Sequence, residues 1–145
     1  MFLGQHQTSL KLNSELEIPT SFRNLLSGQV VVTQGFDRNI LVLPVDVFQN
    51  LSRLVTALNI ADPLARKLMR MLLGNAFYSE IDPIGTIKLG EHLKEFASLV
   101  GNVVLIGQGK YFEVWSQDAW GKQELELQDV EANSERFSSL NLAGF

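Results

Sequence analysis

Apolar and polar residues alternate in short stretches of this chain, and turn residues separate the stretches. In the clearest stretch, Ile87 and Leu89 are predicted to point inward, and Thr86 and Lys88 outward. The preceding segment 82–85 contains a proline and a glycine, which is typical of a turn. The pattern therefore predicts a turn followed by a short strand with one face in solvent.

The same pattern occurs 71 positions earlier, at residues 15–18. There Leu16 and Ile18 are predicted to point inward, and Glu15 and Glu17 outward. With the offset increased to 72, the match continues through the following strands and turns: Val31 with Val103, Val32 with Val104, Gly35 with Gly107, Leu43 with Trp115 and Phe48 with Trp120. Two fused copies of a small α+β unit explain this order, since the period is too long for the common solenoid repeats. The alternative is that any two hairpins with glycine turns look alike.

Two amphipathic helices are predicted between the copies, and the second begins at Asp62. Its apolar face is predicted to hold Leu64, Leu68, Met71 and Leu72. Its polar face carries a basic stripe of Arg66, Lys67 and Arg70. This stripe is either a solvated helix face or a surface that meets acidic groups of a neighbouring subunit or DNA.

The last part of the chain is acidic. Residues 117–132 have the pattern of one helix, and from Asn133 onward Ser, Asn and Gly become frequent. We expect this tail to be mobile or to become ordered only against a partner.

Composition narrows the function classes. The 145 residues are 46% hydrophobic and 19% charged, which is ordinary for a globular protein, and they include no cysteine. The formal net charge of −4 counts against unspecific nucleic-acid binding, but not against a local patch that an oligomer repeats. No apolar run suggests a membrane span, and the start of the chain has no signal-peptide pattern. We therefore expect a cytoplasmic protein.

Residues suited to catalysis or cofactor binding are sparse. His6 and His92 share no motif, and no cysteine can join them in a metal site. The segment 107–109 begins like a dinucleotide loop, but it lacks the third glycine and precedes a predicted strand. Phe112, Trp115 and Trp120 are better explained as core or interface residues than as a base-stacking surface. The sequence therefore predicts no enzyme, cofactor, metal or small-molecule substrate.

Several segments resemble the MraZ family of bacterial transcriptional regulators, in the right order over roughly residues 1–120. They are Met1-Phe2-Leu3-Gly4, Ile18-Pro19-Thr20-Ser21-Phe22-Arg23, Val31-Val32-Thr33-Gln34-Gly35, Asp62-Pro63 with Ala65-Arg66, Gly74-Asn75-Ala76, Ile81-Asp82, Val104-Leu105-Ile106-Gly107-Gln108-Gly109 and Phe112-Glu113-Val114-Trp115. The resemblance implies a tandem duplicated AbrB-like swapped-hairpin β-barrel, with one pseudo-twofold domain and flanking helices. The expected boundaries are 5–47 for the first repeat, 48–75 for the linking helices, 76–119 for the second repeat, and 120–145 for the acidic helix and tail. The resemblance also implies a ring-shaped homo-oligomer that binds short promoter repeats upstream of cell-wall and division genes, which would place it at the nucleoid.

The motif that contacts DNA in the family departs from its usual form here. Each MraZ copy usually carries Asp-x-x-Gly-Arg, in which Arg contacts DNA. The first copy has Glu15 at the Arg position, and the second keeps Asp82 and Gly85 but has Thr86 there. Gly90 also stands where the family has proline. The candidate DNA-binding residues are therefore Lys11, Asn13, Glu15, Asp82, Gly85, Thr86 and Lys88.

Loss of the arginines changes the expected chemistry. An arginine offers a charged bidentate fork to phosphate or guanine, whereas Glu15 and Glu17 repel phosphate. Lys11 and Lys88 still offer positive charges, and Thr86 offers one hydroxyl. A DNA-binding regulator is the first hypothesis, and a homo-oligomeric protein–protein assembly module that has lost or altered DNA binding is the second.

Overall fold

The computed structural model describes residues 1–142 and shows a mixed α+β fold, as the sequence predicts. Every strand pairing is antiparallel. One sheet has six strands in the order β1-β7-β8-β4-β3-β5, and β2 and β6 form a separate two-stranded ribbon. The strands are β1 (Gln5–Ser9), β2 (Glu15–Glu17), β3 (Gln29–Gln34), β4 (Ile40–Pro44), β5 (Phe77–Glu80), β6 (Thr86–Lys88), β7 (Asn102–Gly107) and β8 (Phe112–Ser116).

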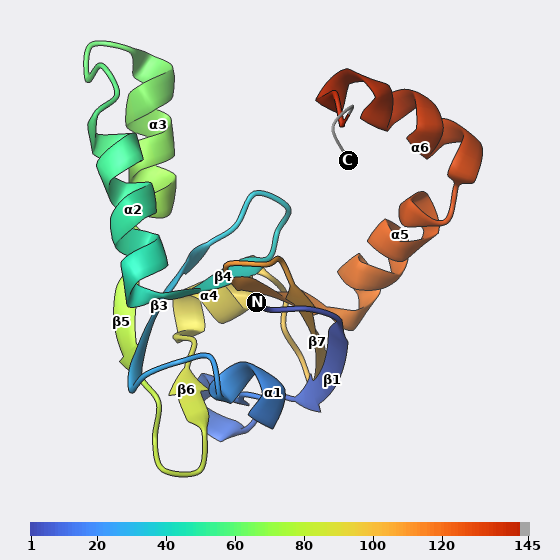
Figure 1. Ribbon diagram of the computed structural model, residues 1–145. Helices are drawn as coiled ribbons and strands as arrows, with labels where there is room; N and C mark the ends of the chain where they lie inside the picture. The colour runs from blue at the N-terminus through green and yellow to red at the C-terminus, as the bar shows by residue number, and fades with distance from the viewer. Residues whose placement is uncertain (143–145) are drawn as a thin grey trace.

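Six α-helices lie within residues 1–142. They are α1 (Thr20–Arg23), α2 (Val45–Thr56), α3 (Pro63–Leu72), α4 (Glu91–Phe96), α5 (Gln117–Leu127) and α6 (Val130–Phe137), with 3₁₀ turns at Leu12–Ser14 and Ser138–Leu140. Figure 1 shows that α2 and α3 form one helical arm and that α5 and α6 form another, both on the same side of the strands. We call residues 45–72 the first arm and residues 117–137 the C-terminal arm.

Strands of the N-terminal half pair with strands of the C-terminal half. The edge strand β1 pairs with β7, and the opposite edge strand β5 pairs with β3. The central contact joins β4 to β8, and the separate ribbon joins β2 to β6. Each half therefore contributes strands that complete the sheet of the other.

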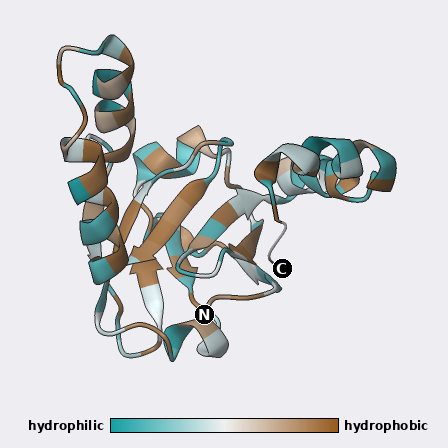
Figure 2. Ribbon diagram, turned by 45° about the horizontal axis from the view of Figure 1, so that its top comes forward, coloured by the Kyte–Doolittle hydropathy of each residue, from teal (hydrophilic) through white to brown (hydrophobic). Residues whose placement is uncertain are grey.

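The apolar side chains form three clusters. The main cluster fills the space between the sheet and the ribbon, and it includes Leu16, Ile18, Phe22, Val30, Val32, Ile87, Leu89, Val103, Leu105 and Phe112. The second lies where the first arm meets the sheet: Val31, Leu41, Leu43, Phe48, Val55 and Leu72. The third, under α5, is smaller: Val104, Ile106, Trp115 and Trp120. Figure 2 shows that hydrophobic residues dominate the central strands. Along the helices of both arms, hydrophobic and hydrophilic residues alternate.

The strand register corrects one step of the sequence comparison. Val31 pairs with Leu43 in the first half, and Val104 pairs with Trp115 in the second. Val31 therefore corresponds to Val104, and not to Val103, which faces the main cluster. The offset is 73 residues for these strands and falls to 72 after the turn that follows, because that turn is one residue shorter in the second half. A one-residue shift reverses the face of every side chain in a strand, so this difference decides which residues meet the arms.

The helical predictions need three corrections. Residues 117–132 form no single helix, because α5 ends at Leu127 and α6 starts after the capping residue Asp129. The segment from Asn133 onward continues as helix to Phe137, while residues 143–145 of the predicted tail lie outside the described part. The predicted apolar face of α3 includes Leu64, but Leu64 is 73% exposed, since α3 meets the sheet only near its C-terminal end.

Candidate nucleic-acid interface

The β2–β6 ribbon brings the candidate residues of both halves together. Its register pairs Glu15 with Lys88, Leu16 with Ile87, and Glu17 with Thr86. Leu16 and Ile87 are buried in the main cluster, so the ribbon is anchored by its central pair. The turns that precede β2 and β6 lie at opposite ends of the ribbon, because the two strands run antiparallel.

Asp82 shapes the second turn. Its carboxylate oxygen Oδ1 accepts hydrogen bonds from the backbone N–H of Ile84 at 3.1 Å and of Thr86 at 2.8 Å. Gly85 follows with a φ of +86°, which a glycine adopts at no steric cost. The carboxylate is engaged with backbone donors, so Asp82 and Gly85 form the turn and present its tip.

The prediction that Thr86 faces solvent is wrong. Thr86 is only 3% exposed, and its hydroxyl is buried without a hydrogen-bond partner in the described structure. Its backbone C=O also accepts from the N–H of Asp82 at 3.0 Å, so the turn folds back onto this residue. The alternation of β6 therefore does not extend to Thr86, and its side chain cannot meet a ligand on the outer face.

The first turn presents exposed side chains but little free positive charge. Lys11 and Asn13 are exposed, whereas Glu15 is half-buried. The Nζ atom of Lys11 lies 3.4 Å from a carboxylate oxygen of Glu17, which offsets its charge. Leu12 is 88% exposed in this turn.

Lys88 is the candidate cation with the most freedom. Its side chain is exposed, and its Nζ forms no ion pair within residues 1–142. Its backbone is held firmly, because the hydroxyl of Ser79 donates to the C=O of Lys88 and accepts from its N–H, each at 3.0 Å. Ser79 thus ties the ribbon to the edge strand β5.

Arg23 is a functional candidate that the motif comparison missed. It comes from α1 of the first half, yet its guanidinium lies against Gly85 of the second half. A Cβ at Gly85 would come within 2.3 Å of Arg23 Cζ and Nε. The contact places an arginine beside the turn whose own motif arginine is replaced. No sequence signal predicted it, since the two residues are joined only by the fold.

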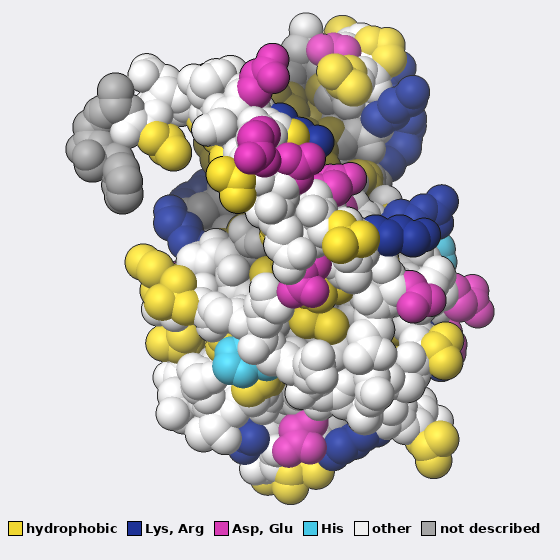
Figure 3. Space-filling model, turned by 90° about the vertical axis from the view of Figure 1, so that its right-hand side faces the viewer, with side chains coloured by type: hydrophobic (Ala, Val, Ile, Leu, Met, Phe, Trp, Pro, Cys, Tyr) yellow, Lys and Arg dark blue, Asp and Glu magenta, His cyan; other side chains and the backbone are white. Residues whose placement is uncertain are grey.

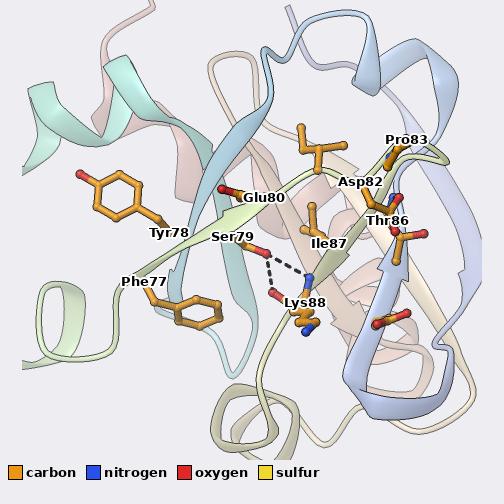
Figure 4. A pocket seen from close by; sticks show the side chains of 11 residues that line it. Phe77, Tyr78, Ser79, Glu80, Asp82, Pro83, Thr86, Ile87 and Lys88 are labelled. Atoms are coloured by element: carbon orange, nitrogen blue, oxygen red, sulfur yellow. Dashed lines mark hydrogen bonds between the residues drawn. The ribbon is translucent and has the colours of Figure 1, made fainter.

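A pocket of about 590 Å³ runs along the ribbon on the side of β5. Figure 4 shows the two hydrogen bonds between the hydroxyl of Ser79 and the backbone of Lys88 in β6. Thr86 lies at the start of β6, and Asp82 lies in the turn before it. Its walls also include Phe77 and the exposed ring of Tyr78. Of the candidates, Glu15, Asp82, Thr86 and Lys88 border this pocket, whereas Lys11 and Asn13 do not.

The histidines do not form a reactive site. The ring of His6 packs against Phe22 with 4.6 Å between ring centroids, and His92 is exposed on α4. Within residues 1–142, no group of three or more His, Asp or Glu side chains is placed to hold a metal ion. None of the helices in that range has the length and apolar content that a membrane crossing requires.

Comparison with known proteins gives consistent similarities. A family model described as "MraZ protein, putative antitoxin-like" matches residues 72–140. The chain is 36% identical to a protein of Roseiflexus castenholzii named "Transcriptional regulator MraZ" over 138 residues, which cover 95% of this chain and 94% of that protein. Proteins of the same name from Thermomicrobium roseum and Methylococcus capsulatus are each 37% identical. These matches cover 85% and 84% of this chain, and 87% and 83% of the two relatives.

Proposed function

Because this chain belongs to the MraZ family, we propose that it is a DNA-binding transcriptional regulator of a division and cell-wall gene cluster. The similar proteins are named transcriptional regulators, a role that requires no catalysis. The protein would act in the cytoplasm at the nucleoid, as a ring-shaped homo-oligomer on promoter DNA.

The interleaved strand pairing supports a tandem swapped-hairpin fold of the AbrB type. If β1 to β4 correspond to β5 to β8, exchanging the two sets turns the order β1-β7-β8-β4-β3-β5 into its own reverse. A pseudo-twofold axis that passes between β4 and β8 produces this exchange. The proposed repeats are 5–47 and 76–119, with helices at 48–75 and a C-terminal segment from residue 120 onward.

The observation that carries the DNA-binding proposal is the ribbon to which both halves contribute one strand. A two-stranded β-ribbon fits the major groove of B-DNA, and its exposed side chains can reach base edges and phosphates. We assign phosphate contact to Lys88, with Lys11 and Asn13 on the other turn. Arg23 adds a guanidinium beside Gly85, in place of the arginine that the second motif lacks.

The proposed binding is weaker than a motif with two arginines would provide. Glu15 and Glu17 put negative charge on the ribbon, and Glu17 offsets Lys11. Few phosphate contacts remain for one copy of the chain. A ring would present several ribbons to repeated sites, and this raises the overall affinity without any new contact.

The alternative is an assembly module that keeps the homo-oligomer and has lost operator binding. The burial of Thr86 and the Lys11–Glu17 ion pair favour it, because both remove groups that could contact DNA. The two hypotheses differ in their salt dependence. A DNA binder loses affinity steeply as salt rises, whereas an assembly module binds little DNA at any salt concentration.

The test is an anisotropy titration of a labelled duplex from the promoter region upstream of the organism's division and cell-wall genes. The titration is run at low and at moderate salt, with a scrambled duplex as the control for sequence. For the regulator we expect preferential binding to the promoter duplex and a steep fall with salt. Replacing Lys88 by Gln should lower the salt slope by roughly 0.9, the value for one phosphate contact. Lys110→Gln, at an exposed position in the turn between β7 and β8, is the matched control. Absence of binding at low salt would leave only the assembly module.

A further inference from the structure

Both helical arms expose large apolar side chains that the chain itself leaves uncovered. On the first arm these residues cluster at the tip and are at least 41% exposed: Leu54, Leu58, Ile60 and Leu64. On the C-terminal arm they are at least 49% exposed: Leu125, Leu127, Val130 and Phe137. Helix α6 buries no residue at all. Apolar surface of this extent on two projecting arms is typical of an interface with another chain.

The two arms carry opposite charge. The first arm has four basic and two acidic residues, and the C-terminal arm has two basic and six acidic residues. On the first arm Arg66 is used internally, since it donates to the C=O of Ile60 at 2.9 Å, while Lys67 and Arg70 are exposed one turn apart. Figure 3 shows Lys and Arg side chains in a column at the upper right, below an apolar tip. Charges of opposite sign on two apolar surfaces favour their association and fix its register.

The arms also differ in how they cover the sheet. In the first arm α3 folds back, so that Leu72 is buried and its C=O accepts a hydrogen bond from the hydroxyl of Thr33 at 2.6 Å. In the C-terminal arm α5 covers the third cluster, and α6 buries no residue. A groove of about 490 Å³ remains there, lined in part by Trp115, Trp120 and Leu127.

One polar group in this groove lacks a partner. The indole N–H of Trp120 is buried without an acceptor in the described structure. The carboxylates of Asp37 and Glu113 also line the groove. An apolar segment that carries a basic side chain fits this combination of aromatic walls, carboxylates and one free donor.

We propose that the first arm of one copy docks on the C-terminal arm of a second copy of this chain. The apolar tip around Leu64 covers the exposed residues of α5 and α6, and Lys67 and Arg70 face acidic residues such as Glu131 and Glu135. This inference rests on the self-assembly in the proposed function, for which it names the surfaces. The two surfaces are different, so the contact is head-to-tail and can repeat from copy to copy until a ring closes.

Charge reversal on each arm tests the contact. One variant carries Lys67→Glu with Arg70→Glu, and the other carries Glu131→Lys with Glu135→Lys. All four residues are exposed, so we expect both variants to fold with an unchanged thermal midpoint. Sedimentation velocity and native mass spectrometry of the full chain should show an oligomer for the wild type. Each variant alone should dissociate at concentrations at least tenfold higher. The equimolar mixture should reassemble, because each acidic first arm then meets a basic C-terminal arm.

Three results would overturn the proposal: a wild type that is monomeric at all concentrations, a charge-reversed variant that assembles like the wild type, or a mixture that stays dissociated. Apolar packing is tested by Leu64→Ser, with Ile84→Ser on the exposed turn as the matched control. Only the first substitution should weaken assembly. The DNA titration is a separate readout, so a protein that assembles as described but ignores promoter DNA would contradict the regulator function alone.

Discussion

Ser14 and Gly85 occupy matching positions at opposite ends of the β2–β6 ribbon. The C=O of Ser14 accepts from the N–H of Leu89, and the C=O of Gly85 accepts from the N–H of Ile18, each at 2.9 Å. Both residues have positive φ, 59° for Ser14 and 86° for Gly85. The ribbon is therefore closed at each end by a left-handed residue of one half and a backbone donor of the other.

The two positions tolerate this backbone for different reasons. Gly85 has no Cβ and adopts positive φ without a clash. Ser14 is a non-glycine residue in the left-handed region, which costs roughly 1–2 kcal/mol. Its buried hydroxyl donates to Oε1 of Glu91 at 2.9 Å, and a hydrogen bond to a charged group offsets a cost of this size.

Gly85→Ala should lower the free energy of unfolding by about 2–5 kcal/mol. About 1–2 kcal/mol comes from the positive φ, and the rest comes from displacing the guanidinium of Arg23, since overpacking costs about 1–3 kcal/mol. The measurement is urea unfolding monitored by tryptophan fluorescence. Gly109→Ala is the matched control, because Gly109 has a φ of 79° but open space around its Cβ position. Equal losses for the two variants would show that Arg23 moves away freely.

Thr86→Val should stabilise the protein by about 1 kcal/mol, because it removes a buried hydroxyl without a partner and keeps the shape of the side chain. It should leave the affinity for promoter DNA unchanged. Thermal unfolding and the anisotropy titration check the two parts. A loss of DNA affinity without a loss of stability would mean that the hydroxyl reaches the ligand, in conflict with its burial.

Glu15→Arg should tighten binding to the promoter duplex by about 1–3 kcal/mol if it restores one bidentate contact. It should also steepen the salt dependence, because a repulsive carboxylate becomes a phosphate ligand. The comparison variant is Glu15→Gln, which removes the charge without adding a donor fork. An arginine variant that binds no better than the glutamine variant would place the contact face elsewhere.

Glu113 should make stability depend on pH. Burial raises the pKa of its carboxyl above the ordinary value of 4.5, and hydrogen bonds from Trp115 and Asn39 oppose this only in part. A carboxyl whose pKa is higher in the folded state binds more protons there than in the unfolded state. Its contribution to stability is therefore fully present below pH 4.5 and is lost as the pH rises through the folded-state pKa.

The variant Glu113→Gln should remove this pH dependence. The free energy of unfolding of the wild type minus that of the variant should fall as the pH rises above about 4.5. Urea unfolding at a series of pH values measures the difference, and Glu80→Gln on the exposed face of β5 is the control. In the variant an amide NH2 replaces one of the two acceptor oxygens, so it keeps an acceptor for only one of the two sites that Asn39 and Trp115 use in the wild type. A difference that rises with pH would contradict the direction of the shift.

Local sequence patterns predicted the individual elements well. The strands around Leu16, Val31 and Ile87 lie where alternation and β-branched runs place them. Asp62 caps α3 as expected, with its carboxylate accepting from the N–H of Leu64 at 2.9 Å. These features depend on neighbours within a few residues, so the chain specifies them without its fold.

What the sequence by itself determined, then, is the set of strands, turns and helix starts, and the family of the chain. The tertiary structure alone decided which strands pair, because backbone hydrogen bonds between distant strands carry no local signature. It also decided that Thr86 is buried, that Arg23 lies on Gly85, and that α3 folds back while α6 does not. Each of these depends on segments that are distant in sequence and meet only after the two halves have interleaved.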